Sequence, residues 1–485
     1  MKTESAIGSS LGLCLSAIAA IGLSAAPLAG CDDGSSSGGG DAGADSGSDA
    51  DSDGDSDSDT DGDSDSDSDA DGGADYNLDQ AISDQAQGTT IAFSALAMMT
   101  GNLEAQSFFP PGKVADYTGF QFLRDNDPDD MGHTGDFLTR VAFNVIYLLA
   151  DDQFADLKAL ATTQVALIEE YGYKRYSLMQ AFRRTLEGDL PDGSTGLNLN
   201  AVKQASRDLY VIDGQISFDR ALLYANILDS MDSEQIAYLD DMAGAGWASW
   251  PDITQDQVQE KLAGLEPGEG VAVMTYAGDL FSWYAGSIAA DVYFCPERHG
   301  TYYGSFYMKD APAMGHPDYA IDTELTGEAG MALIDSSLGY VTEEQAATMY
   351  GLVETQRDNL YDGPVNIVDT RAEIAGLLRT LLVSTSSSDE VEADVLALSE
   401  TYGDLDGENN FYYARVFAEV YASMTGEQKT ALMDLRHSIL SGTYADETPF
   451  DYTTCATFYL FAAEIEDPSV LDPYIADTDW LFFEP

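Results

Sequence analysis

Residues 212–225, IDGQISFDRALLYA, recur without a gap as residues 405–418, LDGENNFYYARVFA. An aliphatic residue, Asp, Gly, Phe and two Ala occupy the same places in both copies, 193 residues apart. Apolar residues in each copy recur at three- and four-residue intervals, the spacing of a helix with one buried face. We therefore expect a helix at both places and a duplicated arrangement of helices around them.

Four helix starts share a signature that ends in glutamine. Three have the Asp/Thr-x-x-Gln spacing of a capping box, and the fourth has Ala in the first position: Asp232–Gln235, Thr342–Gln345, Thr425–Gln428 and Ala150–Gln153. Each follows an apolar segment, so each predicts a helical hairpin with a tight turn. The first two glutamines, 153 and 235, are repeated by 345 and 428 with offsets of 192 and 193 residues.

The same periodicity runs through most of the chain from about residue 76, so the sequence predicts an all-α fold. The match between the copies extends upstream, where Gly101 and Phe108-Phe109-x-Pro111 pair with Gly286 and Tyr293-Phe294-x-Pro296. Self-similarity over such a distance is typical of an internal repeat. We expect a helical-hairpin domain in two halves of about 190 residues each, residues 76–255 and 256–485.

The formal net charge is −64. From residue 76 on there are 67 of the 85 Asp and Glu and 20 of the 21 Lys and Arg, which leaves −47 for the helical part. Nucleic acids and anionic lipid headgroups bind to basic surfaces, so this balance argues against both as partners. An acidic surface suits a salty habitat, or attracts cations and basic partners.

The first thirty residues have the order of a secretory signal: Lys2, an interrupted apolar region over 7–26, then small residues. The apolar region is too broken by Gly and Ser to span a bilayer. Leu28-Ala29-Gly30-Cys31 resembles the lipobox of bacterial lipoproteins. The resemblance implies a signal peptide over 1–30, palmitate or a similar acyl chain on Cys31, and a membrane-anchored place in the cell envelope, on the periplasmic face or the cell surface. The alternative is an ordinary cleavage site beside a cysteine.

Residues 32–75 contain 17 Asp, no Lys or Arg, and no apolar residue larger than Ala. Such a segment buries too little apolar surface to offset its ordering entropy, so residues 31–75 are expected to be a lipidated cysteine followed by a disordered linker. Asp57-x-Asp59-x-Asp61-Gly62 begins like an EF-hand loop, but the twelfth position is Ser68 rather than Glu. A plain spacer and a weak multivalent calcium binder are the two interpretations.

Two cysteines remain once Cys14 is assigned to the signal and Cys31 to the anchor: Cys295 and Cys455. A pair of cysteines in an exported protein indicates a disulfide. Closing a loop of about 160 residues would contribute about 5 kcal/mol in the chain-entropy model. Two unpaired core thiols are the alternative.

One loop occurs in both halves with a histidine at the same place. The first copy contains Met131-Gly132-His133 and the second Met314-Gly315-His316. His133 and His316, with Met131 and Met314 as softer ligands, are candidates for a shared metal ion or a haem. The alternative is a turn that both copies inherited, with no ligand.

The sequence contains no Gly-x-Ser-x-Gly, His-Glu-x-x-His, P-loop or dinucleotide-binding motif. It therefore does not indicate an enzyme, and the first hypothesis is a non-catalytic envelope lipoprotein that binds a protein or small-molecule partner. The second is a metal- or haem-binding protein that uses the Met-Gly-His loops. The third is a carbohydrate-active enzyme, since paired carboxylates in an acidic cleft hydrolyse glycosides.

Overall fold

The computed structural model describes residues 82–100, 135–285, 333–439, 473 and 478–485. Within these ranges the regular structure is helical apart from two strands of two residues, which confirms the all-α prediction. The shorter elements of the described ranges include α6 (Gly135–Leu148), α9 (Ser233–Ala243), η1 (Trp247–Ser249), α10 (Gln255–Leu262), η4 (Ser336–Leu338) and α17 (Gly426–Ile439).

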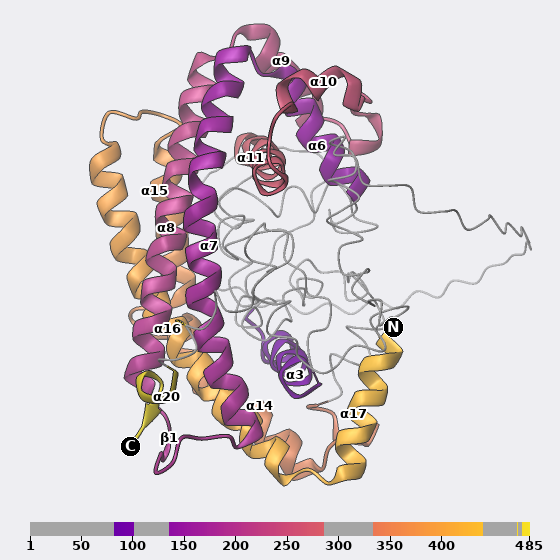
Figure 1. Cartoon of the computed structure of the whole chain (residues 1–485), viewed down its shortest axis with the longest axis vertical. Helices are drawn as coiled ribbons and strands as arrows, with labels where there is room; N and C mark the ends of the chain where they lie inside the picture. Colours follow the sequence, from indigo (N-terminus) through magenta and orange to yellow (C-terminus); the bar gives the residue numbers. More distant parts are fainter. Residues whose placement is uncertain (1–81, 101–134, 286–332, 440–472, 474–477) are drawn as a thin grey trace, which may run out of the picture. The chain divides into compact units, whose positions relative to one another are not determined.

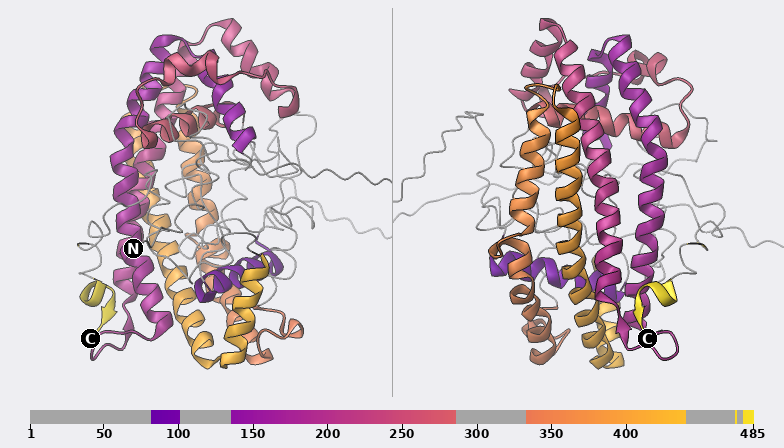
Figure 2. Two further views of the ribbon diagram at one scale, coloured as in Figure 1. Left: turned by 45° about the vertical axis from the view of Figure 1, so that its right-hand side comes forward. Right: turned by 90° about the vertical axis from the view of Figure 1, so that its left-hand side faces the viewer.

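Four helical rods lie side by side in these ranges (Figures 1 and 2). Three are single helices: α7 (Asp151–Glu187), α8 (Leu199–Ser230) and α16 (Ser388–Ser423). The fourth is segmented into α14 (Glu343–Arg357), the π-helical turn η5 (Asp358–Asp362) and α15 (Ile367–Thr380). α7 packs on α8, α8 on α16, and α16 on both α14 and α15, so the rods form one row.

α8 and α16 approach each other closely because small residues meet where they cross. A Cβ atom on Gly214 would collide with Ser399 Oγ, and one on Gly407 would lie 2.7 Å from Ser206 Cβ. These are the glycines of the two Asp-Gly pairs, and the two serines are related by the same offset in the sequence. The repeated stretches therefore pack on each other in an antiparallel sense, each glycine against the serine of the other copy.

The glutamine signatures cap the helices as expected. Gln235 and Gln345 complete capping boxes with Asp232 and Thr342. The glutamines also pair: Gln235 Nε2 donates to Gln153 Oε1 at 2.8 Å, and Gln428 Nε2 donates to Gln345 Oε1 at 2.7 Å.

The two glutamine pairs make further contacts of the same kind. Gln153 donates to the Ser230 hydroxyl at 2.9 Å, and Gln345 donates to the Ser423 hydroxyl at the same distance. Each serine lies at the end of the rod that follows, so each pair ties the start of one rod to the end of its neighbour. The same hydrogen bonds thus occur twice, at the spacing of the sequence repeat.

The fourth rod is interrupted where α7, which occupies the matching place in the first half, is continuous. Gly363 N donates to the Asp358 carbonyl oxygen at 3.0 Å and closes the π-helical turn. A Cβ atom on Gly363 would collide with that oxygen, so the turn requires glycine. The chain restarts at Asn366, whose side chain accepts from Asp369 N at 2.8 Å and caps α15.

Two apolar helices pack on the row from elsewhere in the chain. α11 (Pro267–Ala285) packs on α6 and α7 and contacts α8 and α9, whereas α3 (Asp84–Thr100) packs on α14, α16 and α17. α11 lies in the predicted second half, 256–485, and contacts helices of the first half; α3 lies in 76–255 and contacts mainly helices of the second. Each half is thus completed by a helix from the other part of the sequence.

The last residues return to the row. β2 (Phe483–Glu484) follows α20 (Thr478–Leu481) and pairs antiparallel with β1 (Gly196–Leu197). Phe483 is buried, and the Arg184 guanidinium lies 5.2 Å from the centroid of its ring. This contact joins the C-terminal segment to the end of α7.

The α8–α16 crossing predicts a strong dependence on Gly403. A Cβ atom there would lie 2.8 Å from both Arg207 Cα and the Ser206 carbonyl oxygen, and these backbone atoms cannot rotate away. Gly403→Ala should lower the free energy of unfolding by about 1–3 kcal/mol, the range for overpacking. Urea denaturation measures it. Gly351→Ala on α14 is the control: nothing lies within 4 Å of its Cβ, so it should raise stability by up to about 1 kcal/mol. Equal effects of the two substitutions would contradict the close approach.

Candidate functional site

The candidate site residues chosen from the sequence lie outside the described residues. This holds for Cys31 and the linker, for Cys295 and Cys455, and for the two loops with His133, His316, Met131 and Met314. The lipidation, disulfide and metal or haem assignments therefore stay predictions. Within the described ranges, no group of three or more His, Cys, Asp or Glu side chains is arranged to hold a metal ion.

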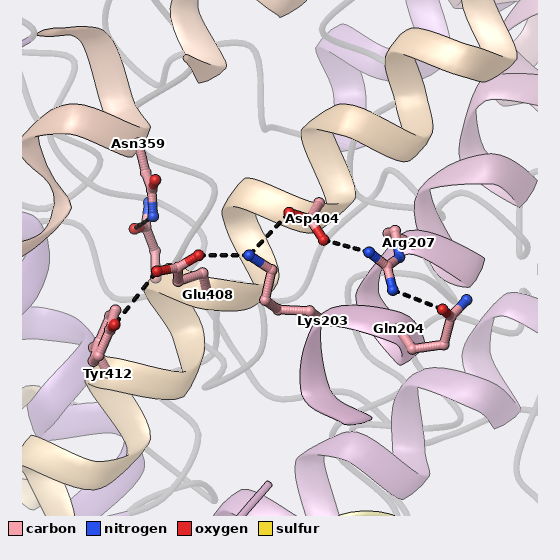
Figure 3. Close-up of polar contacts among 8 residues, drawn as sticks. Lys203, Gln204, Arg207, Asn359, Asp404, Glu408 and Tyr412 are labelled. Atoms are coloured by element: carbon pink, nitrogen blue, oxygen red, sulfur yellow. Dashed lines mark hydrogen bonds and ion pairs between the residues drawn. The ribbon is translucent and has the colours of Figure 1, made fainter. Parts of the chain in front are cut away.

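Charged side chains bridge α8 and α16 at their crossing (Figure 3). Lys203 Nζ lies 2.9 Å from Asp404 Oδ2 and 2.5 Å from Glu408 Oε2, and Arg207 Nη1 lies 2.6 Å from Asp404 Oδ1. We call these four residues the Lys203 cluster. Burial would lower the pKa of Lys203, but its hydrogen bonds and charge interactions with the two carboxylates outweigh burial and raise it. The two carboxylates thus both contact Lys203, and the ion pairs of the cluster join α8 to α16 where they cross.

A second charged cluster is fully buried between α7, α8 and α11. It consists of Gln164, Arg220, Tyr224, Tyr276 and Asp279, which we call the Arg220 cluster. Arg220 is 1% exposed and Asp279 3%. Their ion pair, Arg220 Nη1 to Asp279 Oδ2, is 2.7 Å long and joins α8 to α11.

Neighbouring side chains hold this ion pair in place. The Arg220 guanidinium carbon lies 3.8 Å from the centroid of the Tyr276 ring, a cation–π contact. The Tyr276 hydroxyl donates to Gln164 Oε1, and Gln164 Nε2 donates to Asp219 Oδ2 at 2.9 Å. Hydrogen bonds therefore hold both the oxygen and the nitrogen of the Gln164 amide. The Tyr276 ring packs against the Arg220 guanidinium.

Three donor groups of the Arg220 cluster have no hydrogen-bond partner among the described residues. They are Nε and Nη2 of Arg220 and the hydroxyl of Tyr224. Tyr224 follows Arg220 by one helical turn on the same face of α8, so both side chains point toward the same region. A buried donor without an acceptor costs about 1–3 kcal/mol. A cluster with three such donors is suited to a ligand that supplies acceptors.

Burial changes the acidity of this cluster. It raises the pKa of Asp279 to about 6, although the charge and hydrogen bond of Arg220 oppose the shift. It raises the pKa of Tyr276 to about 12, again against Arg220, and raises that of Tyr224 well above its ordinary value. Arg220 stays positively charged, while Asp279 is able to take up a proton near neutral pH.

The second half of the row lacks these charges at the matching places. In the repeated stretches, Arg220 aligns with Tyr413 and Tyr224 with Phe417. The register that pairs Gly101 with Gly286 puts Ser94 opposite Asp279. Gln164 is matched by Gln356, which accepts a hydrogen bond from the Tyr413 hydroxyl at 2.6 Å. The buried glutamine is thus common to both copies, although its tyrosine partner comes from a different position in each, Tyr276 on α11 and Tyr413 on α16. The ion pair and the unpaired donors are not repeated at the matching positions.

The chain matches no protein-family model, no curated protein and no solved structure. None of the helices in the described ranges is both long enough and apolar enough to cross a membrane. Neither Arg220 nor Asp279 belongs to a recognisable sequence motif; the one signal is that Arg220 stands opposite Tyr413 inside the repeated stretch.

The raised pKa of Asp279 predicts a pH-dependent stability. Its carboxyl binds a proton more tightly in the folded protein, with a pKa of about 6, than in the unfolded chain, whose ordinary value is 3.8. The stability it contributes is therefore complete below about pH 4 and is lost as the pH rises through 6. In urea denaturation from pH 4 to pH 7, the stability of the wild type relative to Asp279→Asn should fall by roughly 1–3 kcal/mol.

The control is Asp241→Asn, an exposed aspartate on α9. Its pH profile should run parallel to that of the wild type, because the substitution removes no buried carboxyl. A parallel profile for Asp279→Asn as well would show that this carboxyl is not perturbed.

Proposed function

We propose that the chain is a lipid-anchored cell-envelope protein whose duplicated helical domain binds a small ligand and does not transform it. The observation that carries the proposal is the Arg220 cluster, a buried charged site with unpaired donors in one half of a repeated framework. The anchor is supported by Leu28-Ala29-Gly30-Cys31 and by the acidic segment that follows it, which would act as a spacer.

Repeated contacts support the duplication. At the α8–α16 crossing, Gly214 contacts Ser399 and Gly407 contacts Ser206. The two contacts are equivalent, because the glycines are 193 residues apart and so are the serines. The two glutamine pairs and their serine acceptors recur at the spacing of the same repeat. Because side-chain contacts as well as sequence motifs recur at one spacing, a gene duplication explains them more simply than independent origin.

The difference between the halves supports ligand binding in the first. A residue needed only to complete the fold is expected at both copies, as Gln164 and Gln356 are. Arg220, Tyr224 and Asp279 are not repeated: uncharged residues, Tyr413, Phe417 and Ser94, fill the positions that match them. A framework that is stable with uncharged residues there does not require the ion pair, so a role in binding accounts for it.

The anchor predicts lipid labelling of Cys31. When the full chain is produced in a bacterial host with an alkyne analogue of palmitate, the wild type should carry the label. Cys31→Ala should carry none, because no other cysteine follows the lipobox pattern. Labelling can be measured by click chemistry and gel fluorescence, with Cys295→Ala as the matched control that keeps the label. Equal labelling of wild type and Cys31→Ala would remove the anchor from the proposal.

Ligand binding can be tested with probes of different chemistry. Acetate, phosphate, glucose and putrescine should be added separately to the purified chain at constant ionic strength, and Tm should be measured. At least one probe should raise Tm of the wild type and not of Arg220→Gln, since binding to the folded state alone stabilises it. The bound probe should be recovered unchanged by NMR. A probe that is consumed, or a panel without effect on the wild type, would contradict a non-catalytic ligand-binding function.

A further inference from the structure

The Arg220 cluster leaves one particular edge of its guanidinium unused. Asp279 binds Nη1, whereas Nε and Nη2 have no acceptor among the described residues. Nε–H and one N–H of Nη2 lie parallel on the same side of the planar group. This edge matches two oxygens of a carboxylate, which accept both hydrogens at once.

Resting on the ligand-binding function proposed above, we propose that the Nε–Nη2 edge of Arg220 binds the carboxylate of a small organic anion between α8 and α11. The hydroxyl of Tyr224 is the third donor to the same group. Phosphate and sulfate also have oxygens at this spacing, but they bring more oxygens than the three unpaired donors can satisfy. A carboxylate uses all three donors and leaves no further charged oxygen buried.

The charges around the site are compatible with a second carboxylate beside Arg220. Asp279 already faces the guanidinium, and two negative charges in a buried site would repel each other. Burial raises the pKa of Asp279 to about 6, so its carboxyl gains a proton more readily than an exposed one and can become neutral when the ligand enters. Another acid, Asp219, accepts hydrogen bonds from Gln164 and Gln215, both at 2.9 Å.

The second half supplies an internal comparison. Its matching residues, Tyr413 and Phe417, offer one hydroxyl, and Gln356 accepts from that hydroxyl at 2.6 Å. Neither residue offers a charged donor, so the site is not repeated at the matching place in the described part of the chain. We expect one anion bound per chain.

The experiment compares acetate with acetamide, its neutral isostere, as probes of the purified full chain. Isothermal titration at constant ionic strength should give a stoichiometry of one for acetate and a much weaker or undetectable response for acetamide. Tyr224→Phe should weaken acetate binding about tenfold, the effect expected for one hydrogen bond to a charged group. Its hydroxyl has no partner among the described residues, so removing it should leave Tm without acetate unchanged or raised.

Arg220→Lys keeps the positive charge but has no parallel pair of N–H groups, so acetate binding should be lost. Tyr413→Phe is the matched control: it removes a hydrogen-bonded hydroxyl from the second half, so it should lower Tm and leave acetate affinity unchanged. Three results would overturn the carboxylate site: no acetate binding to the wild type, equal binding of acetamide, or equal acetate affinity in the wild type, Tyr224→Phe and Arg220→Lys. Binding of glucose or putrescine but not acetate would overturn the carboxylate alone and keep the ligand-binding function.

Discussion

The contact between α8 and α16 is the constraint on which the rest of the described structure depends. Gly214 and Gly407 let two long helices approach until each glycine touches a serine of the other copy. The close approach brings Lys203 and Arg207 within ion-pair distance of Asp404 and Glu408. These ion pairs add to the packing of the two helices. The outer rods, α7 and α14–α15, then pack on either side of this central pair.

The same framework treats charge differently in its two halves. In the second half, the Tyr413 hydroxyl donates to Gln356, whose amide donates to Gln87, and an uncharged tyrosine stands in the place of Arg220. In the first, a buried arginine and a buried aspartate form an ion pair, and the ring of Tyr276 packs against the arginine. Ion pairs in protein interiors add little stability over apolar packing. Stability alone therefore does not account for the Arg220–Asp279 ion pair, and this is the reason for proposing a binding role for it.

The sequence predicted the local structure well because helices and caps depend on neighbouring residues. Asp232, Thr342 and their glutamines form the capping boxes that their spacing indicated. The exchange of α3 and α11 was not predictable, since it depends on which distant apolar faces fit each other. Asp279 was missed because an acid among 67 in this part of the chain carries no local signal, whereas Arg220 stood opposite Tyr413 in the aligned stretches. The positions at which the two copies differ, as well as those at which they agree, therefore point to Arg220.

The position of α3 bears on the order in which the chain can fold. α3 precedes every other described helix, yet its main contacts are with α14, α16 and α17, which all belong to the second half of the sequence. All the helices that α11 contacts have been synthesised by the time α11 is made. The helices that α3 contacts most are synthesised later, so α3 lacks these partners until then. Such distant pairing slows folding and leaves apolar surface exposed in the meantime. The first described helix therefore docks only after the second half of the sequence has been made, and a chain that ends before α14 leaves that helix without its main partners.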